Sequence, residues 1–535
     1  MTNRSSAWHD ARKQRPRRDS RVALVALAVV SAWLTAFLGL PLVQLFVGNV
    51  ALGDVRRVIG EGAVWRVVWF SAWQASLSVL ATFVIAMPVT LLIGSRQFRG
   101  RRLLRATTTV GFLLPSVVVA AAFLAVLPRS MRSTMTAVVL AHAYFNIAVV
   151  VRVVGSRLEA IDARLLQASR ALGAAPLRVM TTVIWPLVRG AVASAGAVVF
   201  LYCFTSYAVV RLLGGPSRNT VESDIALRAF GIGDVSSAGV LAVLQVIIIT
   251  AVVGVVLRSA GRHGVELRAA AGLTRLSRRG RPAAAVVAVA TGGFVVVPLL
   301  AVLWRSVRVS DAFTLLAWRS YGETWILESV TSSLRTAAVA GLLGLLLAGA
   351  AALAVVRLPR LGRMLDPVSV VPLAVSPVTV GLGLVVTFDQ SWYDWRGAWW
   401  FVAVAHTLVA FPLVVRVLVP AWRAIPERLH EAAAVLGAGG VRRIVDVDLR
   451  LLRRSFVAGS GLAVAVSLGE FGAASLLSRR GVETMPVAIT RLLGRTGDLV
   501  RAQAFVLASM LIGLCFVAML VVELALGRGD RASRR

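Results

Sequence analysis

A chain of 535 residues that is 58% hydrophobic, with a mean hydropathy of +0.80, is too apolar for a soluble protein of this length. Its net charge of +33 would suggest a nucleic-acid partner in a soluble protein, but no nucleic-acid motif accompanies the charge. In a membrane protein the same excess is expected, because basic residues face anionic lipid head groups on the cytoplasmic side. The two cysteines, Cys203 and Cys515, lie in apolar runs and indicate no disulfide framework.

Apolar runs of about 20 residues recur along the chain, which is the length that a helix needs to cross a hydrocarbon core of about 30 Å. The chain is therefore predicted to be an all-α polytopic membrane protein with twelve transmembrane helices. They are expected at 22–47, 67–94, 106–127, 134–154, 190–213, 237–257, 283–304, 330–356, 367–388, 398–419, 456–477 and 502–527. The basic residues 1–21 lack a small-residue cleavage site, so they are interpreted as a retained tail.

The distribution of positive charge predicts the orientation of these spans. With the N-terminus in the cytoplasm, the inner segments contain 40 of the 58 Lys and Arg residues, and the outer segments contain the other 18. An even number of spans returns the basic C-terminus to the same side. The bias predicts a multi-pass membrane protein with both termini in the cytoplasm. The Ala/Val/Arg-rich, nearly lysine-free composition suggests a high-GC bacterial genome, so the expected location is a bacterial plasma membrane.

The middle of the chain repeats at a distance of 264 residues. That shift places His142 on His406 and Leu172-Gly173-Ala174 on Leu436-Gly437-Ala438, within polar segments where chance similarity is a poor explanation. Six spans per half give both halves the same orientation, so we expect two parallel six-helix repeats with a path between them. The predicted organisation is a basic tail (1–21), a first half (22–257), a cytoplasmic linker (258–282), a second half (283–527) and a basic tail (528–535).

A polar insert interrupts the apolar pattern between the fourth and fifth spans of each half. In the second half, residues 431–436 are strong helix formers, and Gly437, Gly439 and Gly440 offer positive-φ positions that end a helix. In the first half Gly173 has the same place, and Pro176 suits the first turn of a following helix. The pattern predicts a helix–turn–helix on the cytoplasmic membrane surface that meets a soluble partner.

The two inserts resemble the cytoplasmic coupling loop of binding-protein-dependent ABC importer permeases, whose motif is E-A-A, three residues, Gly, nine residues and I-x-L-P. The second copy departs from this motif at Arg450, which replaces Pro, and the first copy departs at Gln167 and Trp185. The resemblance implies that Glu431 contacts an ATPase subunit and that the two docking sites are unequal. The residues implied in ATPase coupling are Gln167, Ala168, Gly173, Pro186, Glu431, Ala432, Ala433, Gly437 and Leu449.

Nearly the whole chain is similar to the fused permeases of ferric-iron and thiamine importers. The segments that carry this similarity are 98–102, 203–215, 360–363, 372–384 and 467–477. It implies the type I ABC importer permease (MetI-like) fold, two separate ATPase subunits, an extracytoplasmic substrate-binding protein and contact with membrane lipid, with no nucleic acid. We favour ferric iron as the solute because SLGEFG at 467–472 resembles the iron-type permeases, and thiamine is the alternative because CFTSYAVV at 203–210 resembles the other branch. Another small solute, such as a polyamine, stays open.

No enzyme constellation accompanies these motifs. The one lysine, Lys13, stands outside any phosphate-binding loop, so ATP hydrolysis is expected in partner subunits. The five histidines form no metal motif, and we predict no catalytic residue, metal or cofactor. A secondary transporter of the major facilitator type also has two six-span halves, but it lacks the repeated insert.

Glu470 is the main candidate for the translocation path. An ionisable group among apolar residues costs about 2.5–3.5 kcal/mol to insert, so it normally faces a cavity or a partner. Its repeat mate is Ser206, and we predict that Ser206, Tyr207, Glu470 and Phe471 line the path. A hydrogen bond that packs two helices together is an equally good explanation for Glu470, and packing between helices is the favoured role for His142 and His406.

Overall fold

The computed structural model describes residues 16–215, 217–260, 274–310, 312–322, 324–389, 393–395, 397–479 and 483–527. The predicted C-terminal tail and parts of the N-terminal tail (1–15) and the linker (261–273) lie outside these residues. The described chain is helical apart from two short ladders. β1 (Arg96–Gln97) pairs in parallel with β2 (Thr274–Arg275), and β3 (Arg308–Val309) pairs antiparallel with β4 (Ala312–Phe313). The all-α prediction is therefore confirmed.

Among the described residues, ten continuous helical segments are long and apolar enough to cross a membrane. The third predicted span of each half is instead a pair of helices, bent by 104° between α6 (Arg101–Leu113) and α7 (Ser116–Val126) and by 95° in the second half. Pro115 precedes α7, and in the second half Pro377 opens the helix that follows the bend. Proline fits these bends, because it lacks the N–H that a continuous helix would need.

The described helices form two compact units, and each is considered by itself. The unit that consists of Met1–Gly48, Thr324–Val487 and Gly513–Arg535 contains most of the second half. Its elements are α2 (Pro16–Leu34), η1 (Thr35–Gly39), α3 (Leu40–Val43), η2 (Gln44–Gly48), α17 (Thr324–Arg357), α18 (Leu361–Val368), α19 (Val371–Ala374), α20 (Pro377–Phe388), α21 (Trp399–Arg423), α22 (Glu427–Val435), α23 (Gly440–Arg443), η8 (Ile444–Leu449), α24 (Arg450–Gly469) and α25 (Gly472–Leu477), with parts of α26 (Met485–Leu493) and α27 (Asp498–Gly527).

The other unit, Asn49–Glu323 with Ala488–Ile512, contains most of the first half. Besides α6, α7 and the four strands, its elements are α4 (Leu52–Gly60), α5 (Gly62–Ser95), η3 (Arg129–Met131), α8 (Met135–Glu159), α9 (Ala163–Ala171), α10 (Pro176–Val179), η4 (Met180–Ile184), α11 (Trp185–Phe204), α12 (Ala208–Leu213), α13 (Val221–Ala226), η5 (Leu227–Ile232), α14 (Val235–Ala260), η6 (Arg278–Gly280), α15 (Arg281–Ser306), α16 (Leu316–Arg319), η7 (Ser320–Gly322) and the remainder of α26 and α27.

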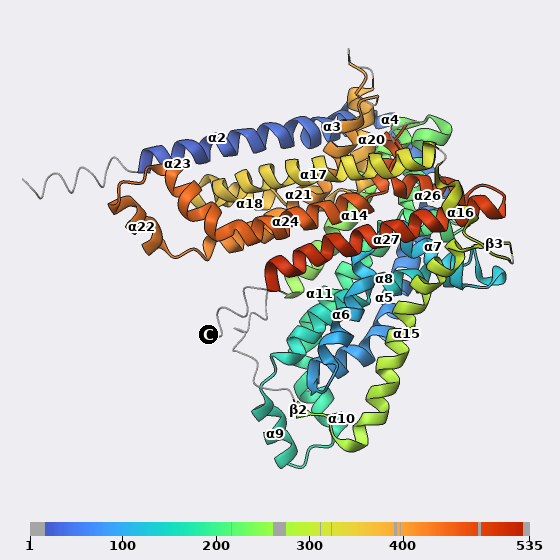
Figure 1. Ribbon diagram of the computed structural model, residues 1–535, viewed down its shortest axis with the longest axis vertical. Helices are drawn as coiled ribbons and strands as arrows, with labels where there is room; N and C mark the ends of the chain where they lie inside the picture. Colours follow the sequence, from blue (N-terminus) through green and yellow to red (C-terminus); the bar gives the residue numbers. More distant parts are fainter. Residues whose placement is uncertain are drawn as a thin grey trace, which may run out of the picture. The chain divides into compact units, whose positions relative to one another are not determined.

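The first span of each half packs within the unit formed mostly by the other half. α2 runs beside α17 (Figure 1), and Val30 and Leu34 share a hydrophobic core with Ala348 and Phe411. In the other unit α15 packs against α7, and its Val295 belongs to the core around Tyr144. Sequence repetition marks where a half begins, but it does not show which half the first span contacts.

A serine in each long helix supports the internal repeat in three dimensions. The hydroxyl of Ser71, on α5, accepts a hydrogen bond of 2.9 Å from the first backbone N–H of α13. The hydroxyl of Ser333, on α17, accepts one of 2.6 Å from the first N–H of α26. Both α5 and α17 have 34 residues, and each serine lies at the same distance from the end of its helix. Residues of α5 and α17 can therefore be matched one to one.

Candidate functional site

The turn of each insert has the backbone that its glycine predicts. Gly173 has φ of +77° and Gly437 has φ of +80°, and each lies two residues after the end of α9 or α22. Ala438 donates its N–H to the carbonyl of Ala433 at 2.9 Å, which closes a left-handed helix cap. Gly439, by contrast, has φ of −70°, so the expectation of further positive-φ glycines here was wrong, and Gly440 instead begins α23.

The second arm of each insert continues into the next span. The helical segments Pro176–Phe204 and Gly440–Gly469 are unbroken, whereas the sequence suggested separate surface helices. Pro176 begins the first of them, as predicted. Each contains one π-helical stretch, η4 before Pro186 and η8 before Arg450, so the irregular turn is present with or without the proline. The second arm of each insert is therefore the end of a membrane helix.

Most residues implied in coupling are exposed. Gln167, Ala168, Gly173 and Pro186 are exposed in the first insert. Glu431, Ala432, Gly437 and Leu449 are exposed in the second, while Ala433 is half-buried.

The inserts also expose two leucines that the sequence analysis missed. Leu172 and Leu436 stand just before the turn glycines, and each side chain is 87% exposed. Their position at the helix end, one residue before a glycine, was the available signal. A protruding apolar side chain at the tip of a helical turn suits a groove on a soluble partner.

The four candidate path residues lie at breaks between helices. Ser206 and Tyr207 are half-buried between α11 and α12, and Glu470 and Phe471 are buried between α24 and α25. Ser206 and Glu470 belong to different compact units, so the structure brings together only the residues of each break. Their role in the translocation path stays a prediction.

Glu470 is engaged on both of its oxygens. Oε1 accepts the N–H of Ala473 and Oε2 that of Ala474, each at 3.0 Å, so the carboxylate caps the N-terminus of α25. Nε2 of His406 lies 3.2 Å from Oε2, and Nδ1 of His406 lies 2.8 Å from the hydroxyl of Ser467. These contacts match the second explanation offered for Glu470, a hydrogen bond that packs helices together.

His142 has a different set of neighbours. Its Nδ1 lies 3.0 Å from the hydroxyl of Ser78, and its carbonyl accepts a hydrogen bond from Asn146. Cys203, at the position equivalent to Ser467, accepts a second hydrogen bond from Asn146. The two histidines are thus packed between helices as expected, but of the two only His406 contacts a carboxylate among the described residues.

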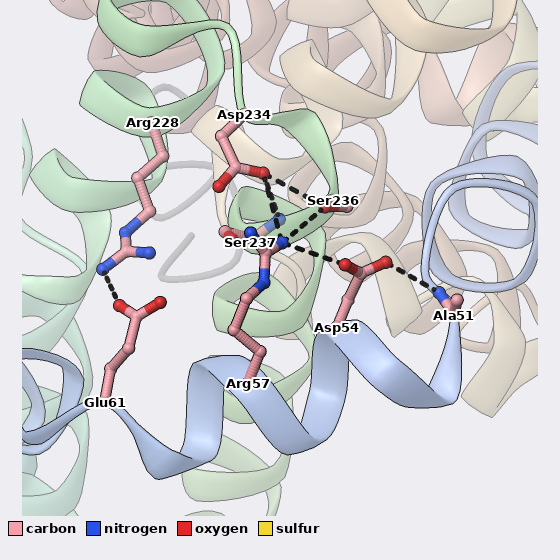
Figure 2. A network of polar contacts seen from close by, with 8 residues as sticks. All are labelled: Ala51, Asp54, Arg57, Glu61, Arg228, Asp234, Ser236 and Ser237. Atoms are coloured by element: carbon pink, nitrogen blue, oxygen red, sulfur yellow. Dashed lines mark hydrogen bonds and ion pairs between the residues drawn. The ribbon is translucent and has the colours of Figure 1, made fainter.

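A polar network fixes α4 on the predicted outer side of its unit (Figure 2). Arg57, on α4, contacts Asp54 at 2.9 Å and Asp234 at 3.9 Å, while Arg228 contacts Glu61 at 3.0 Å. Hydrogen bonds from the hydroxyl and N–H of Ser237 lower the pKa of Asp234. Burial lowers the pKa of Arg228, but hydrogen bonds and charge from Glu61 and Asp224 outweigh it and raise the pKa. These charges hold α4 against the segment before α14.

Comparison with known proteins gives one family and several full-length relatives. Residues 86–263 and 340–526 each match the family described as binding-protein-dependent transport system inner membrane component. The thiamine transport system permease protein ThiP of Escherichia coli (strain K12) is 27% identical over 532 residues, covering 94% of this chain and 95% of the relative. ThiP of Brucella suis biovar 1 (strain 1330) is 26% identical over 490 residues, covering 86% and 88%. A probable ABC transporter permease protein, y4fN of Sinorhizobium fredii (strain NBRC 101917 / NGR234), is 22% identical, covering 95% and 97%.

Proposed function

Because the chain belongs to the binding-protein-dependent transport inner membrane components and is a permease subunit of an ABC importer, we propose that the solute it moves is thiamine. The support is the set of relatives named thiamine permeases, whose alignments cover 91% to 94% of this chain. The family also sets aside the major facilitator alternative. As a permease subunit, the chain is a non-catalytic part of its transporter.

The sequence favoured ferric iron as the solute because of SLGEFG at 467–472, whereas the comparisons favour thiamine. Glu470, the charged residue of that segment, caps α25 and contacts His406. These contacts stabilise the helix break within the protein and involve no solute. The segment therefore gives little support for iron.

Permeases of this family act with an ATPase and a binding protein. On this chain we assign the ATPase contacts to the inserts at 157–189 and 422–454, with one ATPase subunit on each. The exposed leucines Leu172 and Leu436 fit that role, because they would be buried on docking. The binding protein is assigned to the opposite side, where 212–236 and 478–500 would receive it, and both termini are placed in the cytoplasm.

The proposed mechanism is alternating access, with each insert acting as a lever. ATP-driven closure of two ATPase subunits would push on the inserts. The second arm of each insert continues as a helix through Pro176–Phe204 or Gly440–Gly469, so the displacement travels along a stiff rod. Each rod ends at a break that holds candidate path residues, Ser206 in one and Glu470 in the other. Motion of the rods would open and close the path at these breaks.

Uptake by a deletion strain tests the solute. We expect loss of the gene to abolish high-affinity uptake of radiolabelled thiamine and to leave ferric-iron uptake unchanged, and we expect the intact gene to restore thiamine uptake to the wild-type level. If the strain loses iron uptake and keeps thiamine uptake, the proposal is wrong. A second experiment tests the docking sites. The permease is purified with a separate ATPase, and ATP hydrolysis is compared between the wild-type permease and variants in which a single insert residue is replaced.

A further inference from the structure

The second insert contains a buried ion pair at the point where it becomes a span. Asp448, in η8, is fully buried, and its Oδ2 accepts a hydrogen bond of 2.9 Å from the guanidinium of Arg357. Arg357 is the last residue of α17. His430, on α22, places Nε2 3.3 Å from Oδ1 of the same carboxylate. The three side chains thereby join both arms of the insert to the end of α17, within one compact unit.

The first insert has uncharged residues at the equivalent positions. The 264-residue shift places Leu166 on His430 and Ile184 on Asp448. The one-to-one match of α5 with α17 places Ser95 on Arg357, since each is the last residue of its helix. These side chains cannot form an ion pair with one another. The two inserts therefore share a backbone course but are fixed to their units by different chemistry.

A buried carboxylate restricts geometry more than apolar packing does. A lone ionised carboxylate away from water is strongly unfavourable, so Asp448 is stable there only while Arg357 stays within reach. The hydrogen bond is directional, and it holds η8 at one distance from the end of α17. Apolar contact is not directional, and it tolerates small shifts of one surface against another. The second insert is consequently held in one place relative to α17.

We propose that Asp448 is a positioning residue that clamps the second insert to α17 and makes it the stiffer of the two inserts. The meaning of the clamp for transport rests on the proposed function, in which force enters at the inserts. η8 continues into α24, and α17 packs against both α21 and α24. A push on the second insert therefore moves α17 and α24 together. A push on the first reaches α11, whose Leu187 carbonyl accepts a hydrogen bond of 3.1 Å from Arg157 of α8, but no ion pair joins this insert to α5 among the described residues.

Spin labels on the purified permease test the clamp without any partner. Leu172→Cys and Leu436→Cys place labels at equivalent, exposed sites, and the native Cys203 and Cys515 are buried. We expect the label at 436 to be less mobile than the label at 172. Asp448→Asn should raise the mobility at 436 and leave the label at 172 unchanged. Equal mobility at the two sites, or no response at 436 to Asp448→Asn, would overturn the clamp.

A second experiment measures the ratio of solute taken up to ATP hydrolysed in the assembled transporter. Loss of the clamp should lower this ratio by roughly threefold to tenfold, which lies within the range by which single substitutions change the coupling between two sites of a protein. A purely structural role would lower the amount of assembled transporter and leave the ratio unchanged, which contradicts the proposal. The matched control is Asp446→Asn, because Asp446 lies on the same segment but pairs with Arg442 and Arg450 at the surface. It should keep the wild-type ratio.

A double-mutant cycle tests whether the clamp acts as one unit. Arg357→Gln and Asp448→Asn should each lower the ratio, and the double variant should be no worse than the more impaired single variant. Additive losses would show that the two residues act separately and would contradict the clamp. If no ATPase binds the wild-type permease, the proposed function fails, while the spin-label experiment still decides on the clamp.

Discussion

One ion pair occurs in both halves of the chain with its charges exchanged. In the first half Glu159, the last residue of α8, contacts Arg101 at 2.8 Å and also pairs with Arg105, both on α6. In the second half the equivalent residue is Arg423, the last residue of α21, and it contacts Asp366 on α18 at 3.3 Å. The acid stands on the long helix in one half and on the short helix in the other.

The exchange shows what a duplicated membrane protein must retain. A salt bridge needs two complementary charges, but either partner can carry either sign, so the residues can change as a pair. The serine caps, Ser71 and Ser333, are different because a backbone N–H always requires an acceptor. A contact that only one kind of side chain can make keeps its residue. A contact that several pairs of side chains can make is free to diverge between the halves. The following variants test how far the two halves have diverged.

The largest expected effect comes from Glu470→Gln, in the second half only. The amide cannot accept both N–H groups of α25 as the carboxylate does, and His406 loses its charged partner. Breaking a buried pair typically costs about 3–5 kcal/mol, so we expect a clearly lower melting temperature in detergent. Uptake should also fall, while the ATPase still co-purifies. The matched variant Ser206→Ala should change the melting temperature little, and equal behaviour of the two variants would show that the breaks are equivalent.

Next in size are Gly437→Ala and Gly173→Ala at the insert turns. Nothing lies within 4 Å of an added Cβ at either position, so the penalty comes only from the positive φ. An Ala in the left-handed region costs about 1–2 kcal/mol and would misalign the second arm. We expect weaker ATPase co-purification for both variants. Gly439→Ala is the control, because it has φ of −70° and equal space, and a similar loss in that variant would remove the backbone explanation.

The features that the sequence predicted well are those set by local chemistry. Apolar length predicted the spans, and glycine and proline at fixed places predicted the turn at Gly437 and the start of a helix at Pro176. The repeat predicted two copies of the insert. Each of these follows from a few neighbouring residues, whatever the rest of the chain does.

The features that the sequence did not predict depend on residues far apart in the chain. Asp448 meets Arg357 from 91 residues away, and nothing in either local segment indicates the other. The partner of α2 is likewise decided by packing, since its apolar face would fit either half. Broken spans were missed for another reason, because a hydropathy pattern counts apolar residues and is insensitive to a bend at Pro115 or Pro377.

A smaller effect is expected for the two acidic-motif positions of the inserts. Glu431→Ala removes an exposed carboxylate that the family motif assigns to the ATPase contact, whereas Gln167→Ala removes only a neutral amide. An exposed charge at an interface rim contributes on the order of 1 kcal/mol or less, so ATPase co-purification should weaken measurably only for Glu431→Ala. Raising the salt concentration should narrow the difference, because salt screens the charged contact. Equal losses in the two variants would show that the inserts dock alike.

The smallest effect is expected for the exchanged ion pair itself. Arg423 is 54% exposed and Asp366 is 28% exposed, so their contact contributes about 0.2–1 kcal/mol. Asp366→Asn should therefore lower the melting temperature only slightly, and Glu159→Gln should lower it more, because Glu159 is less exposed and contacts two arginines. The decisive variant is the double exchange Asp366→Arg with Arg423→Glu, which gives the second half the polarity of the first. It should recover the wild-type melting temperature that Asp366→Arg alone loses. Failure to recover would mean that the residues around each pair have adapted to one arrangement of the charges. Exchanging the charges would then require further substitutions around the pair.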